Sequence, residues 1–525
     1  MANNGNKPVR GLFEPAKGTR DWYAGEAIVR NHIRDTLRGV FERYGYDRLE
    51  TAALETKEAI TQKGGTEIAK EIYQLRDQGE RELCLRFDQT LPFARYLASN
   101  PNISFPFKRY AIGPVFRDGP TQPDQGRYRE FTQCDVDVAG ISDMAAEAEL
   151  LMLARDAFSS LGLGGVEANV NNRKLLEGIL DAAEVPKEAR GKVIIALDKM
   201  DKIGVEGVRG ELNNLTLFEE ARGISNDSLK ELFDAYDSSG TNAIDNPGIK
   251  GKIIGDVGMY CYEEVKALFF KPELSGERTM LYGEVAGYTS SGEKLITPEQ
   301  ADKVLEISSI TGENYETLGK LENIIGSDTG KEGLKEVRQL LDYAGKMGVD
   351  FVRFNPVLAR GLAYYTGTTM EVFLKDKSIV PSAILAGGRF DDMVGDFRGK
   401  GEVIPAVGFS FGLERLAMII KDQKNFPNTV RQVYVIPVGD KDIGECLHVA
   451  DRLRQQGLNV DMKLQPGGKV GKQIQFAENS GIPYAAVVGE AELGDGTVNL
   501  RDFKKKENIQ IPVSQVGEYI NSNEK

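Results

Sequence analysis

The chain has few of the residues on which many catalytic and metal sites depend. Its 525 residues include only two histidines, His32 and His448, and four cysteines, which lie far apart without a CxxC pair. A histidine base, a disulfide framework and a structural zinc site are therefore disfavoured, and a reducing cytosol is the expected compartment. We predict no resident metal site.

Long apolar runs and targeting signals are also missing from the sequence. No run approaches the roughly 18–20 apolar residues of a membrane span, and residues 1–17 lack the basic-then-apolar pattern of a signal peptide, so no membrane partner is expected. Lysine and arginine total 66 against 79 aspartates and glutamates, a net charge of −13. This balance disfavours broad nucleic-acid affinity but leaves room for RNA bound by a local basic patch.

The composition is that of a globular protein, with 41% hydrophobic and 28% charged residues, and the length suggests about three domains. Apolar residues at helical spacing predict helices at 26–43 and 144–161. A strand is expected at 46–54. Two further strands, at 107–117 and 127–138, flank a loop rich in glycine and proline and form a long hairpin.

The composition and the expected secondary structure change along the rest of the chain. Residues 174–345 are mostly charged helical segments, which predicts a helical insertion, while 351–425 return to strands and glycines. Residues 432–525 alternate short strands with helices, as a compact α/β unit does. The elements expected in these parts are helices at 227–236, 331–346, 413–421, 441–456 and 471–480, and strands at 433–438, 458–463 and 483–488.

Arginines gather on expected strands and beside glycines, whereas Walker A, GxGxxG and HExxH patterns are absent from the sequence. A planar guanidinium binds phosphate oxygens in pairs and stays charged when partly desolvated, so these arginines indicate anion recognition. Ion pairs on a solvated face explain them about as well from residue chemistry alone. The residues concerned are Arg117, Arg127, Arg129, Arg360, Arg389 and Arg415.

Acidic and amide side chains occur at matching places. Asp88, Gln89 and Thr90 follow an apolar stretch, and Gln133 and Asp137 lie four residues apart on the second strand of the hairpin. An even spacing places two strand residues on one face of a sheet. The sequence therefore predicts that an anion site and a site for a cationic or amine ligand share one sheet.

Several longer blocks match one family. They are Lys17-Gly18-Thr19-Arg20-Asp21, Leu85-Arg86-Phe87-Asp88-Gln89-Thr90, Gly126-Arg127-Tyr128-Arg129-Glu130-Phe131, Arg360-Gly361-Leu362-Ala363-Tyr364-Tyr365, Ala386-Gly387-Gly388-Arg389-Phe390-Asp391 and Gly408 to Arg415. Over nearly its whole length the chain resembles the histidyl-tRNA synthetases, which are class II aminoacyl-tRNA synthetases. The block that begins at Arg360 is the most specific to this branch and its paralogues.

The resemblance implies an α+β catalytic domain with the antiparallel class II sheet flanked by helices. It also implies a mostly helical insertion and a C-terminal α/β anticodon-binding domain. The expected boundaries are a flexible leader at 1–16, the two parts of the catalytic domain at 17–173 and 346–425, the insertion at 174–345 and the anticodon-binding domain at 430–525.

The implied reaction joins ATP and L-histidine into histidyl-adenylate and pyrophosphate, then transfers histidine to tRNA(His). The resemblance further implies Mg²⁺ bound with ATP, a homodimer and a cytoplasmic location. Arg117 and Arg360 would stabilise charge at the α-phosphate, and Arg127 and Arg415 would bind the rest of ATP. The residues implied for histidine are Asp88, Gln89, Thr90, Gln133, Asp137, Arg360, Tyr364 and Tyr365, of which Asp137 and Tyr365 would bind the imidazole.

The sequence departs from the family pattern at four positions. Ala52, Asp118, Ala363 and Phe390 replace a usual proline, arginine, aspartate and tyrosine. A non-catalytic paralogue, such as a regulatory subunit of ATP phosphoribosyltransferase in histidine biosynthesis or a tRNA-sensing protein, is therefore kept as the alternative. A synthetase for another amino acid is disfavoured by Gln133, Asp137 and Tyr365 together. Residues 240–330 are longer than the usual insertion and receive no role.

Overall fold

The fold is taken from a computed structural model, which describes residues 13–215, 294–359, 364–399, 401–423, 426–439, 443–465 and 468–523. The chain divides into two units by its internal contacts. The sheet unit comprises residues 40–120 and 130–412. The terminal unit comprises the residues up to Gly39, the loop 121–129 and residues 413–525. Residues 1–12 of the expected leader lie outside the described residues.

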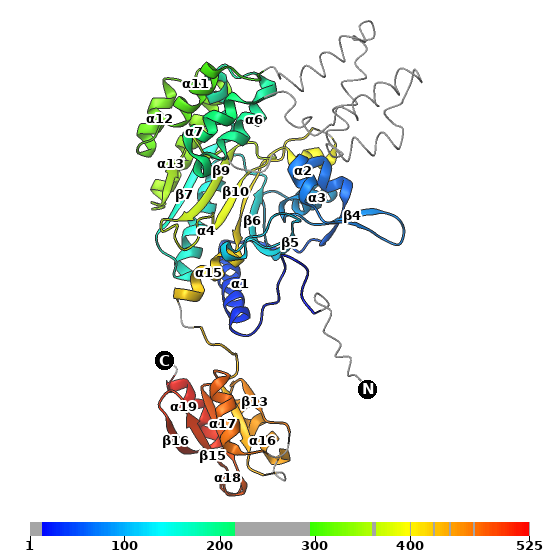
Figure 1. The fold of residues 1–525 in the computed structure, drawn as a ribbon, viewed down its shortest axis with the longest axis vertical. Helices are drawn as coiled ribbons and strands as arrows, with labels where there is room; N and C mark the ends of the chain where they lie inside the picture. Colours follow the sequence, from blue (N-terminus) through cyan, green and yellow to red (C-terminus); the bar gives the residue numbers. More distant parts are fainter. Residues whose placement is uncertain are drawn as a thin grey trace, which may run out of the picture. The chain divides into compact units, whose positions relative to one another are not determined.

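An eight-stranded sheet forms the centre of the sheet unit, in the order β1-β5-β6-β11-β10-β9-β7-β8 (Figure 1). Every neighbouring pair from β5 to β7 is antiparallel, whereas β1 runs parallel to β5 and β8 runs parallel to β7. The strands are β1 (Asp47–Arg48), β5 (Phe107–Phe116), β6 (Glu130–Ala139), β7 (Val166–Asn172), β8 (Val352–Phe354), β9 (Thr368–Leu374), β10 (Leu385–Arg389) and β11 (Ala406–Gly412).

One face of this sheet is apolar and is covered by helices. Phe158 of α4 (Ala145–Leu161) packs edge-on against Phe411 of β11, with ring centroids 5.4 Å apart. Phe41, near the end of α1 (Gly25–Arg43), contacts Tyr110 of β5 at 5.7 Å and Phe411 at 6.1 Å. These large apolar side chains are buried, so this face anchors the sheet and leaves the opposite face for polar residues.

A smaller sheet and three helices form a second core in the same unit. The sheet has the order β2-β4-β3, and its core includes Phe87, Leu91, Phe93 and Phe390. Its elements are β2 (Leu54–Thr56), α2 (Lys57–Glu71), β3 (Gln74–Arg76), β4 (Glu82–Leu85), α3 (Thr90–Ser99) and α14 (Met393–Arg398).

The described part of the expected insertion is helical. A Cβ atom on Gly178 of α5 would lie 2.5 Å from Gly330 Cα of α13, so the two helices pack closer than larger side chains allow. The helices are α5 (Arg173–Ala182), α6 (Lys187–Leu197), α7 (Met200–Asn213), α11 (Pro298–Ser308), α12 (Asn314–Glu322) and α13 (Asp328–Lys346).

The terminal unit contains a five-stranded sheet in the order β13-β12-β14-β15-β16. Strands β13 and β14 run parallel to β12, and the last two strands are antiparallel. Apolar clusters on both sides of β12, one around Val435 and one around Ile436, form its core. The unit's elements after Gly412 are α15 (Leu413–Gln423), β12 (Val433–Pro437), α16 (Ile443–Gln455), β13 (Val460–Met462), α17 (Val470–Asn479), β14 (Tyr484–Val488), α18 (Glu490–Asp495), β15 (Thr497–Asp502), β16 (Glu507–Pro512) and α19 (Val516–Asn523); the 3₁₀ turns η1 (Pro123–Gln125) and η5 (Val513–Gln515) also belong to it.

The expected fold class is confirmed, and some local expectations are wrong. The expected strand at 46–54 is instead two short strands, β1 and β2, separated by residues without strand pairing. The return strand of the hairpin begins at Glu130 and not at 127, because Arg127 closes the loop by bridging to Gln122. The helix expected at 227–236 lies outside the described residues.

Candidate active site

The polar face of the large sheet is formed by alternate residues of β6. Gln133, Asp135 and Asp137 point to this face, because side chains two apart on a strand share a side. The register pairs Asp137 with Arg109 of β5 on one side and with Gly408 of β11 on the other. Three adjacent strands, β5, β6 and β11, therefore place polar or very small residues on one surface.

Glycines keep this surface open. A Cβ atom on Gly408 would overlap the Asp137 carboxylate, and a Cβ atom on Gly388 would lie 2.9 Å from the ring of Tyr365. Gly388 and Gly408 are direct neighbours across β10 and β11. Any larger residue at either position would displace a side chain that the resemblance assigns to histidine.

Two buried residues of this face were not expected from the sequence, Arg109 and Asp135. Arg109 Nη2 lies 2.7 Å from Asp137 Oδ2 and 3.9 Å from Asp135 Oδ2. The same nitrogen donates a hydrogen bond to the Gln89 carbonyl oxygen at 3.0 Å, and the guanidinium lies 4.6 Å from the Phe93 ring centroid. The even spacing that selected Gln133 and Asp137 also includes Asp135, so this residue could have been found.

Burial governs the protonation of the two carboxyl groups. It raises the pKa of Asp135 to about 8 and that of Asp137 to about 6, and the charge of Arg109 opposes the rise at both. The groups interact and titrate as a pair. The face therefore holds several buried acceptor oxygens beside one cation, Arg109.

Several polar atoms of this face have no hydrogen-bond partner among the described residues. The contact between Arg109 and Asp137 is an ion pair without hydrogen-bond alignment. Buried polar atoms are nearly always paired in folded proteins, so their concentration indicates a place that a ligand completes. The atoms are Arg109 Nε, Gln133 Oε1, Asp135 Oδ1, Asp137 Oδ2 and Thr369 Oγ1.

The structure brings Asp88, Tyr364 and Tyr365 together. Asp88 Oδ1 accepts a hydrogen bond from the Leu91 amide at 2.9 Å, and Oδ2 accepts one from the Tyr364 hydroxyl at 3.1 Å. The two tyrosine rings lie 5.1 Å apart. Burial raises the pKa of Asp88 and of both phenols, and the charges of Asp88 and Asp137 raise that of Tyr365 further. Both phenols are therefore neutral and able to donate.

Gln89 and Thr90 follow Asp88 at the start of α3. Thr90 hydrogen-bonds with the Tyr364 hydroxyl. Gln89 is buried, and its carbonyl oxygen is the acceptor of Arg109. Phe390, one of the departures from the family pattern, packs edge-on against Tyr364 at 6.3 Å inside an apolar cluster, so its missing hydroxyl leaves no buried polar atom unpaired there.

The arginines expected to bind ATP occupy different settings. Arg117 follows β5, donates a hydrogen bond from Nε to the Phe87 carbonyl oxygen at 3.2 Å, and lies 4.0 Å from the Phe87 ring centroid. Arg127 is exposed on the loop 121–129. Arg415 lies in the first turn of α15, and its Cγ lies 3.2 Å from where a Cβ of Gly126 would be.

Two of the arginines singled out from the sequence require separate comment. Arg360 lies outside the described residues, as do Gly361, Leu362 and Ala363. The expectation that Arg389 belongs to an anion site is wrong. Arg389 forms two hydrogen bonds of 2.7 Å with the buried carboxylate of Glu147. Burial lowers the pKa of Arg389, but the hydrogen bonds and the charge of Glu147 outweigh this effect and raise it. It therefore has a structural role between β10 and α4.

Within the described ranges, no three histidine, cysteine, aspartate or glutamate side chains form a group that could hold a metal ion. In the same part of the chain, no helix is both long and apolar enough to cross a membrane.

Two family models match the chain. The model for histidyl-tRNA synthetase matches residues 18–240 and 284–416, and the model for an anticodon-binding domain matches residues 432–523. A histidine–tRNA ligase 1 of Bacillus cereus is 37% identical over 96% of this chain and 99% of its own length. Histidine–tRNA ligase of Caenorhabditis elegans is 31% identical over 97% and 87%.

Solved structures agree with these matches. Histidyl-tRNA synthetase from Nostoc sp. PCC 7120 aligns with a TM-score of 0.69 and 26% identity, over 97% of this chain and 99% of that chain. A protein from Bacillus halodurans C described as an ATP phosphoribosyltransferase regulatory subunit/histidyl-tRNA synthetase aligns at 0.62 over 92% and 99%. At 18% sequence identity, this alignment supports a shared fold only.

Proposed function

The chain belongs to the histidyl-tRNA synthetase family, and we propose from this membership that it attaches L-histidine to tRNA(His) through a histidyl-adenylate made from ATP. The observation that carries the proposal is the buried acceptor face of Gln133, Asp135 and Asp137, which suits a ligand rich in N–H donors. The non-catalytic alternative is not favoured, because relatives aligned over nearly their whole length are histidine–tRNA ligases.

We assign the ammonium group of histidine to Asp88, Thr90 and Gln133, and the imidazole to Asp137 and Tyr365. Support comes from Gln133 Oε1 and Asp137 Oδ2, buried acceptors that have no hydrogen-bond partner among the described residues and are costly unless a donor reaches them. Tyr364 and Gln89 complete the pocket by orienting Asp88 and Arg109, respectively. Because side chains without matching donors leave these acceptors unpaired, the pocket selects histidine.

We propose that Arg117 binds the α-phosphate, and that Arg127 and Arg415 bind the remaining parts of ATP. The resemblance also assigns Arg360 to charge at the α-phosphate. The histidine carboxylate attacks the α-phosphorus, the bond to the bridging oxygen breaks, and pyrophosphate leaves with the electron pair. The attacking group is already an anion, so positioning and cationic stabilisation suffice without a protein base. Mg²⁺ enters with ATP as part of the substrate and shields its phosphate charge.

We further propose the domain boundaries expected above, with catalytic parts at 17–173 and 346–425, an insertion at 174–345 and an anticodon-binding domain at 430–525. The match of residues 432–523 supports the last of these. We also propose a homodimer, as the family resemblance implies. The buried thiols of Cys84, Cys134 and Cys446 suit the reducing cytoplasm that we propose as the chain's location.

Aminoacylation by the full chain tests this function. With ATP, Mg²⁺ and labelled histidine, we expect the chain to charge tRNA(His) and to leave a non-cognate tRNA uncharged. Histidine-dependent release of pyrophosphate without any charging of tRNA(His) would limit the chain to amino-acid activation. The absence of both would contradict the proposal.

A further inference from the structure

We propose that Trp22 is a positioning residue that holds the loop 121–129 and the start of α15 in place for ATP. The inference rests on the proposed function, because these two elements carry Arg127 and Arg415. Trp22 is the only tryptophan in the chain. Every contact used below lies within the terminal unit.

Trp22 joins three side chains from separate segments. The guanidinium carbons of Arg20 and Arg30 each lie 4.2 Å from the indole ring centroid. The ring of Tyr128, on the loop 121–129, meets Trp22 edge-on at 5.6 Å and an interplanar angle of 76°. Cation–π and edge-to-face contacts are attractive, so the indole links the loop to α1.

The link continues from α1 to α15. Arg30 Nη1 donates a hydrogen bond to Glu414 Oε1 at 2.8 Å, and both side chains are buried. Glu414 immediately precedes Arg415. A buried pair of this kind fixes its partners firmly, because either charge alone would be costly in this setting. Trp22 therefore contacts the arginine that orients the first turn of α15.

The segment before Trp22 contacts the same loop through its backbone. The Arg129 amide donates a hydrogen bond to the Gly18 carbonyl oxygen at 2.8 Å. Gly18 has a φ of 85°, and a Cβ there would lie 2.6 Å from Thr121 Cγ2. Both ends of the loop 121–129 thus contact Gly18, while Trp22 contacts Tyr128 between them.

Loss of the indole should loosen this arrangement without unfolding the chain. Arg20 keeps its ion pair with Glu26 at 2.6 Å, and Arg30 keeps Glu414. The loop loses its edge-to-face contact with the indole, and the hydrogen bonds from Arg129 to Gly18 and between Tyr128 and Arg20 still join it to this segment. A misplaced loop weakens the binding of ATP, while the histidine pocket lies on other residues.

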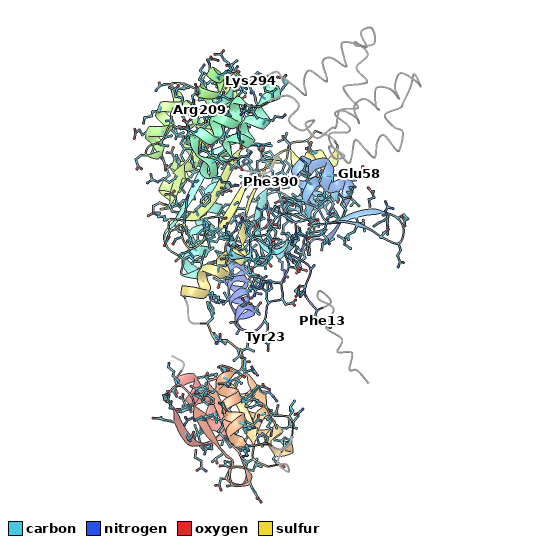
Figure 2. All side chains as sticks on the ribbon, viewed as in Figure 1. Phe13, Tyr23, Glu58, Arg209, Lys294 and Phe390 are labelled. Carbon is cyan, nitrogen blue, oxygen red and sulfur yellow. The ribbon has the colours of Figure 1, made fainter. Side chains whose placement is uncertain are left out.

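The test compares Trp22→Ala, Trp22→Phe and the control Tyr23→Ala in histidine-dependent ATP–pyrophosphate exchange. Tyr23, labelled in Figure 2, is the adjacent aromatic residue and is 83% exposed. For Trp22→Ala we expect the KM for ATP to rise about tenfold, with the KM for histidine and kcat within about twofold of the unaltered chain. Trp22→Phe should restore part of the loss, and Tyr23→Ala should change nothing.

A role in folding alone would lower kcat through a smaller active fraction and leave the KM for ATP unchanged. That result in folded Trp22→Ala would overturn the inference. If the variant does not fold, the fluorescence of the unaltered chain decides, since its tryptophan emission comes from Trp22 alone. ATP without histidine should then shift this emission with a midpoint near the KM for ATP, and an unmoved emission would overturn the inference. Failure of the proposed function is distinct, because the unaltered chain would then show no exchange.

Discussion

At the scale of single residues, the acceptor face depends on one arginine serving two carboxyl groups. Arg109 contacts Asp137 at 2.7 Å and Asp135 at 3.9 Å, and all three are buried. The spacing of β6 predicts that Gln133 and Asp137 share a face. It does not predict Arg109, because this residue reaches Asp137 only through the register of β5 with β6. Register depends on the whole hairpin and is not readable from either strand.

The raised pKa of Asp135 makes stability depend on pH. The folded chain keeps on Asp135 a proton that the unfolded chain releases near pH 4, so the free energy of unfolding falls as pH rises from about 4 to about 8. Asparagine has a similar shape and does not titrate. As pH rises from about 5 to about 8, the free energy of unfolding of the Asp135→Asn variant should increase by about 1–3 kcal/mol relative to that of the unaltered chain. Thermal unfolding of the variant and of the unaltered chain at both pH values measures this change. A difference in melting temperature that is the same at both pH values would contradict it.

Asp137 is expected to affect the binding of histidine and not the binding of ATP. Asp137→Asn replaces one acceptor oxygen by a donor, so the imidazole loses a partner. The KM for histidine in pyrophosphate exchange should rise at least about tenfold, and the KM for ATP should stay within about twofold.

The matched control is Asp350→Asn, which changes an exposed carboxylate ahead of β8. It should leave both constants unchanged. An unchanged KM for histidine in Asp137→Asn would remove this residue from the pocket.

At the scale of elements, the glycines of β10 and β11 decide which side chains fit above the sheet. A methyl group on Gly408 would overlap the Asp137 carboxylate. We expect Gly408→Ala to cost about 1–3 kcal/mol of stability and to raise the KM for histidine at least about tenfold.

The control is Gly319→Ala in α12, where a Cβ meets nothing within 4 Å. Alanine in the middle of a helix should stabilise the chain by about 0.5–1 kcal/mol and leave activity intact. Equal histidine constants for the two variants would contradict the role of Gly408.

Elements with strong local patterns were predictable, and those that depend on neighbours were not. The spacing of apolar residues predicts α1 and α4 to within one residue at each end. The strand expected at 46–54 fails, because Asp47 and Arg48 pair with β5 whereas Leu54 pairs with β4 of the other sheet. The chain leaves one sheet and enters another there, and local alternation does not mark that change.

At the scale of the whole molecule, the sequence predicts the family and most of the proposed site, because the motif blocks are long. The interpretation of Arg389 is wrong, because this arginine beside two glycines pairs with the Glu147 carboxylate and not with an anionic ligand. Local composition does not distinguish a buried ion pair from a binding site. To distinguish them, one must know that Glu147, 242 residues away in the sequence, lies against Arg389 in the fold.

The C-terminal part should be needed for tRNA and not for adenylate formation. Every strand of the large sheet precedes residue 413, and residues 432–523 have their own sheet and core. A chain lacking residues 430–525 should keep pyrophosphate exchange within about threefold and lose at least about tenfold in kcat/KM for tRNA(His).

Aminoacylation kinetics with increasing tRNA measure this loss. The exchange reaction of the same preparation serves as the control for folding. Full charging efficiency in the shortened chain would contradict an anticodon-binding role for these residues.

The most direct test of the central claim is ATP–pyrophosphate exchange by the purified full chain, with each standard amino acid supplied in turn. We predict exchange with histidine alone, because an imidazole and an ammonium group together satisfy the buried acceptors of Gln133 and Asp137. Exchange with a different amino acid, or none with any amino acid in the folded protein, would contradict it.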